Sequence, residues 1–552
     1  MKRMKKYLVI ALALIVGGCS IAQQNQSTET NAARRPKIIV GITVDQMRYD
    51  YIERFWDDFG NDGFKRLVND GFFARNLHYN YMPTYTGPGH AAIYTGTSPA
   101  YNGIIANDWY ERTTKKMVYC SSDSTVAGVG TASAAGKMSP HYLKSTTLGD
   151  ELKLFTNGKS KVIGVALKDR GAILPAGRSA DAAYWFVGAQ EGVWATSNWY
   201  RNELPQWVSD FNASGKAADY MKQTWTPYLT PDRYSKSSAD NNPYELPYKG
   251  TIRPTFPYVL DSLKALNGGY ELLKATPFGN TMSVDFALAA LTGEQMGQDE
   301  FTDMLCLSFS ATDYVGHQFG MHSMETQDVY VRLDLEIARL LKELDARYGK
   351  DNYLLFLSAD HAGAPTPSYT SSLKWSAGYW KSDVMEGELN AFLQSKYGEG
   401  NYIESEVNQN IFLNRPLLEQ KKVDITQVNK EVVAFLSKYD EIMTAYTTEE
   451  IRMGAQDPIL NRIRLGFSSK WSGDVIYVLN PDYMEYGRQG TTHGSPFIYD
   501  THVPALFYGF GVTPGTSFEA QTICDIAPTV AAICKLPLPN ACIGQPIKSC
   551  VK

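Results

Sequence analysis

The run KIIVGITVDQ, residues 37–46, is the stretch that decides the predicted fold. Its residues are almost all apolar, and the run stops abruptly at the acidic side chain of Asp45. The runs MLCLSFSATDYVGH (304–317) and NYLLFLSADHAG (352–363) have the same form, because the apolar part of each also ends at an aspartate. Continuous apolar runs of this length are typical of strands buried on both faces, as in parallel sheets.

Segments with helical periodicity lie between these runs. They are MSVDFALAALTGEQM (282–296) and QDVYVRLDLEIARLLKELDARYG (327–349). The alternation of strands and helices predicts an α/β fold with a doubly wound, mostly parallel sheet flanked by helices. Ligands bind beyond the carboxyl ends of the strands in such sheets, so we expect the three acidic strand ends to meet at one edge.

Two stretches break this pattern. Residues 190–275 are rich in Trp, Tyr, Pro, Asn and Ser, and residues 365–490 are similarly mixed, both with weak periodicity. We interpret them as aromatic-rich insertions that build a lid or a substrate wall, with inert loops as the alternative. Residues 37–552 are otherwise predicted to be a single domain.

The N-terminus has the form of an export signal. A basic start at residues 1–6 precedes an apolar run that is far below the roughly 20 residues needed to span a bilayer. The run ends in VGGC, which is similar to a bacterial lipobox. We therefore predict a signal peptide at 1–18, a lipid on Cys19 that anchors an exported, periplasmic or cell-surface protein, and a flexible tether at 19–36. An ordinary signal peptide is the alternative.

Charge and cysteine content narrow the function classes. The 552 residues carry a net charge of −5 and no basic run beyond the first six residues, so nucleic acid is excluded as the main partner. Cys306 lies in an apolar run and is expected to be a buried free thiol. An oxidising compartment would permit one or two disulfides in the C-terminal cluster, with connectivity left open. The cluster consists of Cys524, Cys534, Cys542 and Cys550, and the connectivity among these four and Cys120 is open.

Three histidines have sequence neighbours that are typical of metal ligands. Asp313 and His317 are four residues apart, which puts them on one face of a helix. Asp360 and His361 are adjacent at a strand end, where the chain can turn and let both reach one ion. His493 lies in GTTHGS. Mixed oxygen and nitrogen ligands suit zinc or a similar divalent metal, although each pair alone is more often a structural contact.

The stretch PTYTGPGH, residues 83–90, predicts a reactive hydroxyl. Glycine permits close backbone approach and proline suits a first helical turn, which places Thr86 at a helix N-terminus that favours an anion. A threonine hydroxyl needs a base or a metal ion to become a nucleophile. GPGHAA with Asp108 also fits a dinucleotide-binding pattern, but no apolar strand precedes it and proline occupies the turn.

Several longer motifs follow one another along the chain. They are VDQMRYDY (44–51), PTYTGPGHAAIYTGTSPAYNGIIANDWY (83–110), KDRGAILPAG (168–177), SATDYVGHQFG (310–320), SADHAG (358–363), GTTHGSP (490–496) and DIAPTVAAICKLPLP (525–539). Together they resemble the alkaline phosphatase superfamily. The chain is similar in particular to the phosphate-irrepressible alkaline phosphatases with a threonine nucleophile, relatives of the nucleotide pyrophosphatase/phosphodiesterases.

The resemblance implies two zinc ions and a set of phosphate contacts. Asp313, His317 and His493 would hold one zinc; Asp45, Asp360 and His361 would hold the other, with Thr86 as its exchangeable ligand and the nucleophile. Asn107, Lys168 and Arg170 would contact the phosphoryl oxygens. His90 is not a ligand in the family, and Asp500 and His502 are expected to be structural or to support the ligands.

The resemblance implies an exported, broad-specificity phosphate monoester hydrolase that forms a phosphothreonine. Two cations, Lys168 and Arg170, favour the dianionic group of a monoester over a diester. A phosphodiesterase or nucleotide pyrophosphatase with the same zinc pair is the alternative, and a surface binding lipoprotein without chemistry is another. A sulfatase is disfavoured, because those enzymes use a modified Cys or Ser in a C/S-x-P-x-R context. We expect small-molecule monoesters as substrates; oligomeric state is open, with a monomer favoured.

Overall fold

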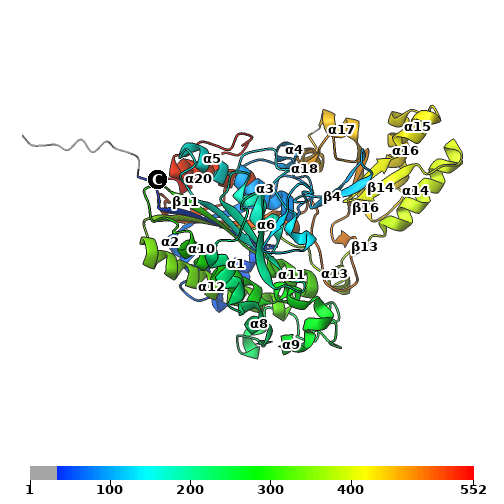
Figure 1. Cartoon of the computed structure of the whole chain (residues 1–552). Helices are drawn as coiled ribbons and strands as arrows, with labels where there is room; N and C mark the ends of the chain where they lie inside the picture. The colour runs from blue at the N-terminus through cyan, green and yellow to red at the C-terminus, as the bar shows by residue number, and fades with distance from the viewer. Residues whose placement is uncertain (1–33, 455) are drawn as a thin grey trace, which may run out of the picture. The chain divides into compact units, whose positions relative to one another are not determined.

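An eleven-stranded sheet forms the centre of the structure, a computed structural model that describes residues 34–454 and 456–552 (Figure 1). The predicted signal peptide, Cys19 and most of the predicted tether lie outside these residues. The strand order is β20 (Gly515–Ser517), β2 (Phe72–His78), β19 (His502–Gly509), β12 (Tyr353–Ser358), β1 (Ile38–Val44), β11 (Asp303–Phe309), β6 (Val162–Ala166), β7 (Ala182–Val187), β8 (Val193–Ser197) and β5 (Gly128–Val129), with β21 (Gln521–Thr522) beside β2.

The middle of this sheet is parallel, as predicted. β12, β1, β11, β6 and β7 run parallel to one another, and antiparallel pairs occur towards the edges, at β12–β19, β19–β2, β7–β8 and β8–β5. The three apolar runs are neighbours: β1 lies between β11 and β12, with Ile42 opposite Leu307 on one side and Leu357 on the other. Every residue of these three strands is buried.

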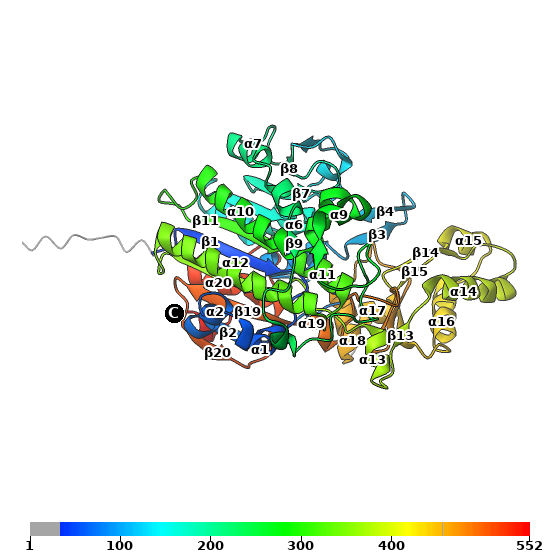
Figure 2. The same cartoon turned by 90° about the horizontal axis from the view of Figure 1, so that it is seen from below.

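Helices cover both faces of the sheet. α3 (Thr86–Thr95), α5 (Leu148–Phe155), α6 (Asp169–Ala176) and α20 (Ile526–Cys534) lie on one face, and α2 (Phe64–Asp70), α10 (Pro277–Gly293) and α12 (Met324–Tyr348) lie on the other (Figures 1 and 2). The two predicted helices, 282–296 and 327–349, start earlier than expected. Pro277 occupies the first turn of α10, and the Ser323 side chain caps α12 by accepting from the Thr326 N–H.

The insertion at 365–490 is a folded unit rather than a set of loops. A four-stranded sheet has the order β14 (Ile403–Val407), β15 (Asn410–Leu413), β17 (Val475–Leu479) and β16 (Ile442–Thr447), and helices α14 (Ser382–Tyr397), α15 (Arg415–Gln420) and α16 (Ile425–Leu436) accompany it (Figure 1). It has a hydrophobic core of its own, which includes Leu389, Val432 and Tyr477. Its role as a lid or wall stays a prediction.

The insertion at 190–275 consists mostly of short elements and loops. It contains α7 (Gln206–Ala213), α8 (Lys216–Met221), the strand pair β9 (Thr224–Trp225) and β10 (Tyr258–Val259), and α9 (Leu260–Leu263). Several of its aromatic side chains are buried: Trp225, Tyr248 and Tyr258 all contact the ring of Phe319. These aromatics therefore attach the insertion to the rest of the protein.

The predicted disulfides do not form among the described residues, where all six cysteines are free thiols. Cys524, Cys534 and Cys550 are each buried within the main hydrophobic core, so they serve as small apolar side chains. Cys306 is buried in β11, as expected.

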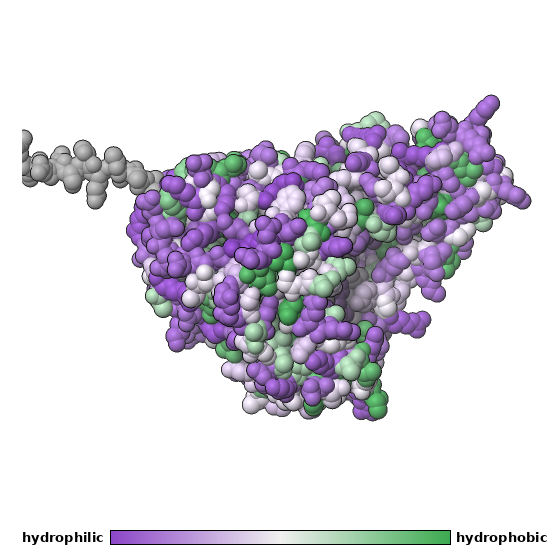
Figure 3. Space-filling model, viewed as in Figure 1, coloured by the Kyte–Doolittle hydropathy of each residue, from purple (hydrophilic) through white to green (hydrophobic). Residues whose placement is uncertain are grey.

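In the described parts of the chain, we find no helix with the length and apolar character needed to cross a membrane. On the face shown in Figure 3 hydrophilic residues predominate, and apolar residues form only small patches.

The close approach of α3 to the end of β12 generates a prediction. A Cβ on Gly89 would lie 1.9 Å from the carbonyl oxygen of Asp360, so Gly89→Ala must displace backbone. We expect a loss of about 1–3 kcal/mol in the free energy of unfolding, measured by thermal or denaturant melts. Gly387→Ala in α14 is the matched control: nothing lies within 4 Å of its Cβ, so it should raise stability by about 0.5–1 kcal/mol. Equal effects of the two changes would contradict the close packing.

Candidate functional site

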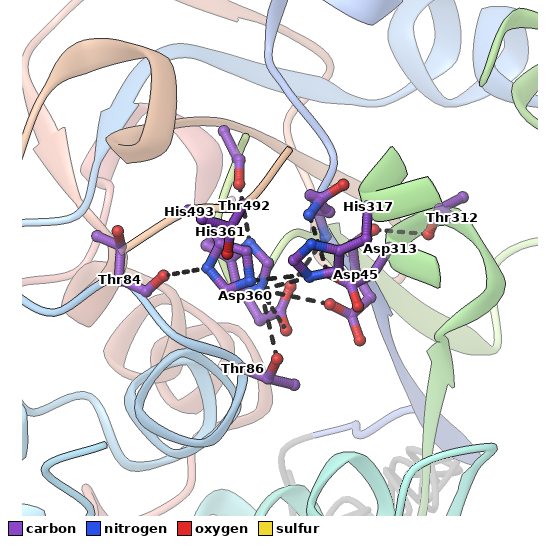
Figure 4. A network of polar contacts seen from close by, with 12 residues as sticks. Asp45, Thr84, Thr86, Thr312, Asp313, His317, Asp360, His361, Thr492 and His493 are labelled. Carbon is purple, nitrogen blue, oxygen red and sulfur yellow. Dashed lines mark hydrogen bonds and ion pairs between the residues drawn. The ribbon is translucent and has the colours of Figure 1, made fainter. Parts of the chain in front are cut away.

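Six side chains meet in two adjoining groups beyond the carboxyl ends of β1, β11 and β12 (Figure 4). Within each group, one ligand atom per residue lies within 4.8 Å of the others. Asp313, His317 and His493 form the first group, and Asp45, Asp360 and His361 form the second. The groups touch: the rings of His361 and His493 stack with centroids 3.4 Å apart.

The sheet and one helix place five of the six residues. Asp45 follows β1 directly, and Asp360 and His361 lie two and three residues beyond the end of β12. Asp313 and His317 lie one turn apart on α11 (Ala311–Phe319), which starts just after β11, so they share a helix face.

His493 comes from a loop more than a hundred residues later along the chain. Asp500 holds this loop, because its Oδ2 accepts hydrogen bonds from the N–H groups of Gly494 and Ser495. Asp500 therefore positions the loop that carries His493. His502 lies away from the two groups, and its ring stacks between those of Tyr49 and His78.

Backbone carbonyls orient the three histidine rings. The Nδ1 atoms of His317, His361 and His493 lie 2.7–2.8 Å from the carbonyl oxygens of Thr491, Ala362 and Thr84, respectively. An N–H at Nδ1 leaves the Nε2 lone pair facing the carboxylates. Each Nε2 lies near a carboxylate oxygen: His317 at 3.1 Å and His493 at 3.7 Å from Asp313, and His361 at 3.4 Å from Asp45.

Negative charge is concentrated in this buried space. Asp45, Asp313 and Asp360 are at most 3% exposed, and burial together with the charge of Asp45 raises the pKa of Asp360 well above its usual value. Asp45 Oδ1 and Asp360 Oδ2 form no hydrogen bond with any described residue, although His361 Nε2 lies 3.4 Å from the former and His90 Nδ1 lies 3.2 Å from the latter. Buried carboxylate oxygens and imidazole lone pairs that converge in this way fit divalent metal ions such as zinc.

Thr86 is the first residue of α3 and lies beside the second group. Its Oγ1 is 3.4 Å from His361 Nε2, and its side chain is buried. The N-terminus of α3 directs the positive end of the helix dipole to this point. A hydroxyl and an anion can therefore be held together here.

Asn107 is oriented by the same helix end. The Gly87 N–H donates to Asn107 Oδ1 at 2.7 Å, which fixes the amide and leaves the Nδ2 donors available to a ligand beside Thr86. Asn107 is partly exposed. Its neighbour Asp108, the acidic residue of the dinucleotide-binding pattern, is the first residue of the short strand β3 (Asp108–Glu111), so Asp108 does not take part in a dinucleotide site.

Lys168 and Arg170 lie at the start of α6. Lys168 is buried, and its Nζ lies 2.6 Å from Asp45 Oδ2 and 2.5 Å from Asp313 Oδ2, so one ammonium bridges the two groups. Arg170 Nη2 lies 3.4 Å from Thr86 Oγ1. Both predicted cations are thus at the site, with Lys168 engaged by carboxylates.

Two residues at the site carry no signal in the sequence. The side-chain amide of Gln46 donates to Asp313 Oδ1 at 3.0 Å and its backbone N–H donates to Asp360 Oδ1 at 3.2 Å, which joins the groups. Tyr119 Oη accepts from Arg170 Nη1 at 3.1 Å and donates to Asp169, which fixes the guanidinium. Only the position of Gln46 beside Asp45 could have suggested its role.

His90 does not join either group through a free nitrogen. Its Nδ1 donates to the carbonyl of Thr86 at 2.9 Å and its Nε2 pairs with Ser308 Oγ at 2.9 Å. Burial lowers the pKa of His90 to about 4, so it is a neutral structural residue at the base of α3.

Comparison with known proteins gives a consistent result. The family model described as type I phosphodiesterase / nucleotide pyrophosphatase matches residues 39–502. A relative from Myroides odoratus named "Calcium-transporting ATPase" is 43% identical, over 94% of this chain and 95% of that protein. Alkaline phosphatase PafA of Elizabethkingia meningoseptica is 41% identical over 98% of both chains. The crystal structure of wild-type PafA superposes with a TM-score of 0.91 at 40% identity, covering 95% of this chain and 100% of that chain.

The two groups generate a prediction about metal content. His317→Ala removes one nitrogen donor from the first group only, so we expect bound zinc to fall from about two ions per chain to about one after dialysis, measured by atomic emission. His502→Ala is the control, because its Nε2 bonds to the carbonyl of Arg75, away from both groups. Two retained ions in His317→Ala would contradict the grouping.

Proposed function

The chain belongs to the type I phosphodiesterase / nucleotide pyrophosphatase family, and we propose that this member hydrolyses phosphate monoesters as an alkaline phosphatase. The observation that carries this proposal is the convergence, beyond one sheet edge, of a buried hydroxyl at a helix N-terminus, two metal-ligating groups and two cations. The full-length likeness to PafA, and 38% identity to alkaline phosphatase PhoV of Synechococcus elongatus over 99% of this chain, support it.

We propose the ligand sets in the arrangement that the family resemblance implies. One zinc ion belongs to Asp313, His317 and His493 and the other to Asp45, Asp360 and His361, with Thr86 next to the latter. When bound, the ions supply positive charge that lowers the pKa of the threonine hydroxyl and of water and neutralises the leaving oxygen.

The protein's own residues then carry out two displacements at phosphorus. Thr86 Oγ1 forms a bond to phosphorus as the bond to the leaving oxygen breaks, which gives a phosphothreonine and an alcohol. Water next forms a bond to phosphorus as the Thr86 Oγ1 bond breaks, which releases phosphate. Asn107 Nδ2 and Arg170 donate to phosphoryl oxygens throughout, and such fixed donors are worth most where charge develops.

Charge at the site favours a monoester over a diester. The Arg170 guanidinium lies next to Thr86 Oγ1, and Lys168 lies within the same buried space. A monoester brings a dianion, for which charge-assisted hydrogen bonds are strongest. Hydrolysis of diesters or pyrophosphates is the second candidate, which the matching family model favours. ATP is a further substrate to test, because the Myroides relative is named as an ATPase.

The predicted export signal and Cys19 extend the proposal to location. A lipid on Cys19 would hold the folded chain at a membrane outside the cytoplasm, where it would release phosphate from small esters. Mass spectrometry of the membrane-extracted protein tests this, because a lipid-modified Cys19 at the N-terminus supports the anchor and any other N-terminus contradicts it.

Steady-state kinetics test the activity. The soluble chain that begins after Cys19 should prefer p-nitrophenyl phosphate to bis-p-nitrophenyl phosphate by at least about tenfold in kcat/KM, and chelation should abolish both rates. Arg170→Ala should narrow the preference, because it removes a cation next to the phosphoryl group. A higher kcat/KM for the diester would make the protein a phosphodiesterase.

Substitution of the nucleophile tests the mechanism. Thr86→Ser keeps a hydroxyl and should retain most activity, while Thr86→Ala should lose about a thousandfold in kcat with both metals retained. Phosphate trapped at low pH should label the wild type and Thr86→Ser but not Thr86→Ala. Near wild-type kcat in Thr86→Ala would contradict the assignment.

A further inference from the structure

A second pair of acidic side chains is buried away from the catalytic groups. Glu245, from the insertion at 190–275, is 1% exposed, and Glu325, in the first turn of α12, is fully buried. Glu245 Oε1 accepts a long hydrogen bond from Ser238 Oγ at 3.5 Å, and Glu325 Oε1 accepts from Tyr258 Oη at 2.5 Å. The remaining oxygen of each, Oε2, is buried without any partner.

The two carboxylates act on each other. Burial and the charge of Glu325 raise the pKa of Glu245 to about 10, and burial raises the pKa of Glu325 to about 8. Asp240 adds further negative charge to both. Within the described residues, neither glutamate forms an ion pair with a Lys, Arg or His side chain. Two buried like charges without a counter-charge are costly, so at neutral pH the pair either holds protons, as the raised pKa values indicate, or is balanced by a bound cation.

Asp328, one turn along α12, is a buried carboxylate whose charge is paired and whose oxygens accept hydrogen bonds. It pairs with Arg332 at 2.8 Å and accepts from Trp225 Nε1 at 2.7 Å and from the Tyr228 N–H at 2.6 Å. Glu325 receives a hydrogen bond from the Tyr258 hydroxyl, and no Lys, Arg or His among the described residues pairs with it. The missing positive charge is therefore particular to the Glu245–Glu325 pair.

We propose that Glu245 and Glu325 hold a Ca²⁺ ion through their unpartnered oxygens. The side-chain groups that contact them are oxygen donors, the Ser238 and Tyr258 hydroxyls, and the pair itself offers carboxylate oxygens. Oxygen-only sets suit hard cations, and irregular loop geometry suits calcium, whereas magnesium requires a near-ideal octahedron and zinc prefers nitrogen or sulfur.

The ion would join the insertion, through Glu245, to the first turn of α12, through Glu325, and α12 follows the helix that carries Asp313 and His317. The Ser238 N–H bonds to the carbonyl of His322, and the Leu246 N–H bonds to the carbonyl of Gln318, next to His317. Residues 238–246 therefore lie along the α11–α12 connection. A calcium ion bound to Glu245 and Glu325 would add a buried link to this contact.

Terbium luminescence tests the site directly in the zinc-loaded full chain. Tb³⁺ is a calcium mimic that emits when a nearby aromatic ring is excited, and Tyr258 contacts Glu325. We expect saturable emission with one ion per chain that Ca²⁺ competes away, and its loss in Glu245→Gln/Glu325→Gln. Asp261→Asn/Glu300→Gln is the matched control, because it removes two exposed carboxylates and should keep the emission.

Thermal melts give a second, independent readout. Millimolar Ca²⁺ should raise the Tm of the wild type by about 3 °C and leave Glu245→Gln/Glu325→Gln unchanged. Without calcium at pH 9, the double variant should melt above the wild type, because folding of the wild type must protonate or bury the charge of two glutamates that are ionised in the unfolded chain, and amides remove that cost. Emission that persists in the double variant, or wild-type stability that responds only to lower pH, would overturn the proposal in favour of a shared proton.

Discussion

Buried negative charge at the end of β1 is the constraint on which the rest of the structure depends. Three carboxylates, Asp45, Asp313 and Asp360, are buried next to one another, and a single ammonium, from Lys168, bridges two of them. Charges so close together persist only if cations occupy the space with them. The histidines fit this need because their Nε2 lone pairs face inward while backbone carbonyls hold their Nδ1 atoms.

The parallel centre of the sheet makes this concentration possible. β1 lies between β11 and β12 in register, so their carboxyl ends fall side by side and the residues that follow them meet. α3 approaches the end of β12 closely enough that only a glycine fits at position 89. This contact brings Thr86, the first residue of α3, next to the carboxylates. The contacts that pack α3 against the sheet edge are thus the contacts that bring the residues of the site together.

The sequence allowed the centre of the fold and the meeting of its acidic strand ends to be predicted, because continuous apolar runs and their acidic ends are local patterns, whereas the division of the ligands into two groups came from the family resemblance. The sheet of the 365–490 insertion was missed, since its strands are short and its edge strand Ile403–Val407 has one buried residue and no apolar run. Gln46 and Tyr119 were missed because their roles come from partners far away in sequence, and an amide or a phenol alone predicts no contact.

The hydrogen bond from His493 Nδ1 to the carbonyl of Thr84 joins residues 409 positions apart in the chain. Contacts of such sequence separation form late in folding, because a long loop must close first. The group of Asp313, His317 and His493 is therefore incomplete until nearly the whole polypeptide is available to fold. If the predicted export signal carries the chain unfolded across a membrane, this group assembles only at the destination and takes its metal there.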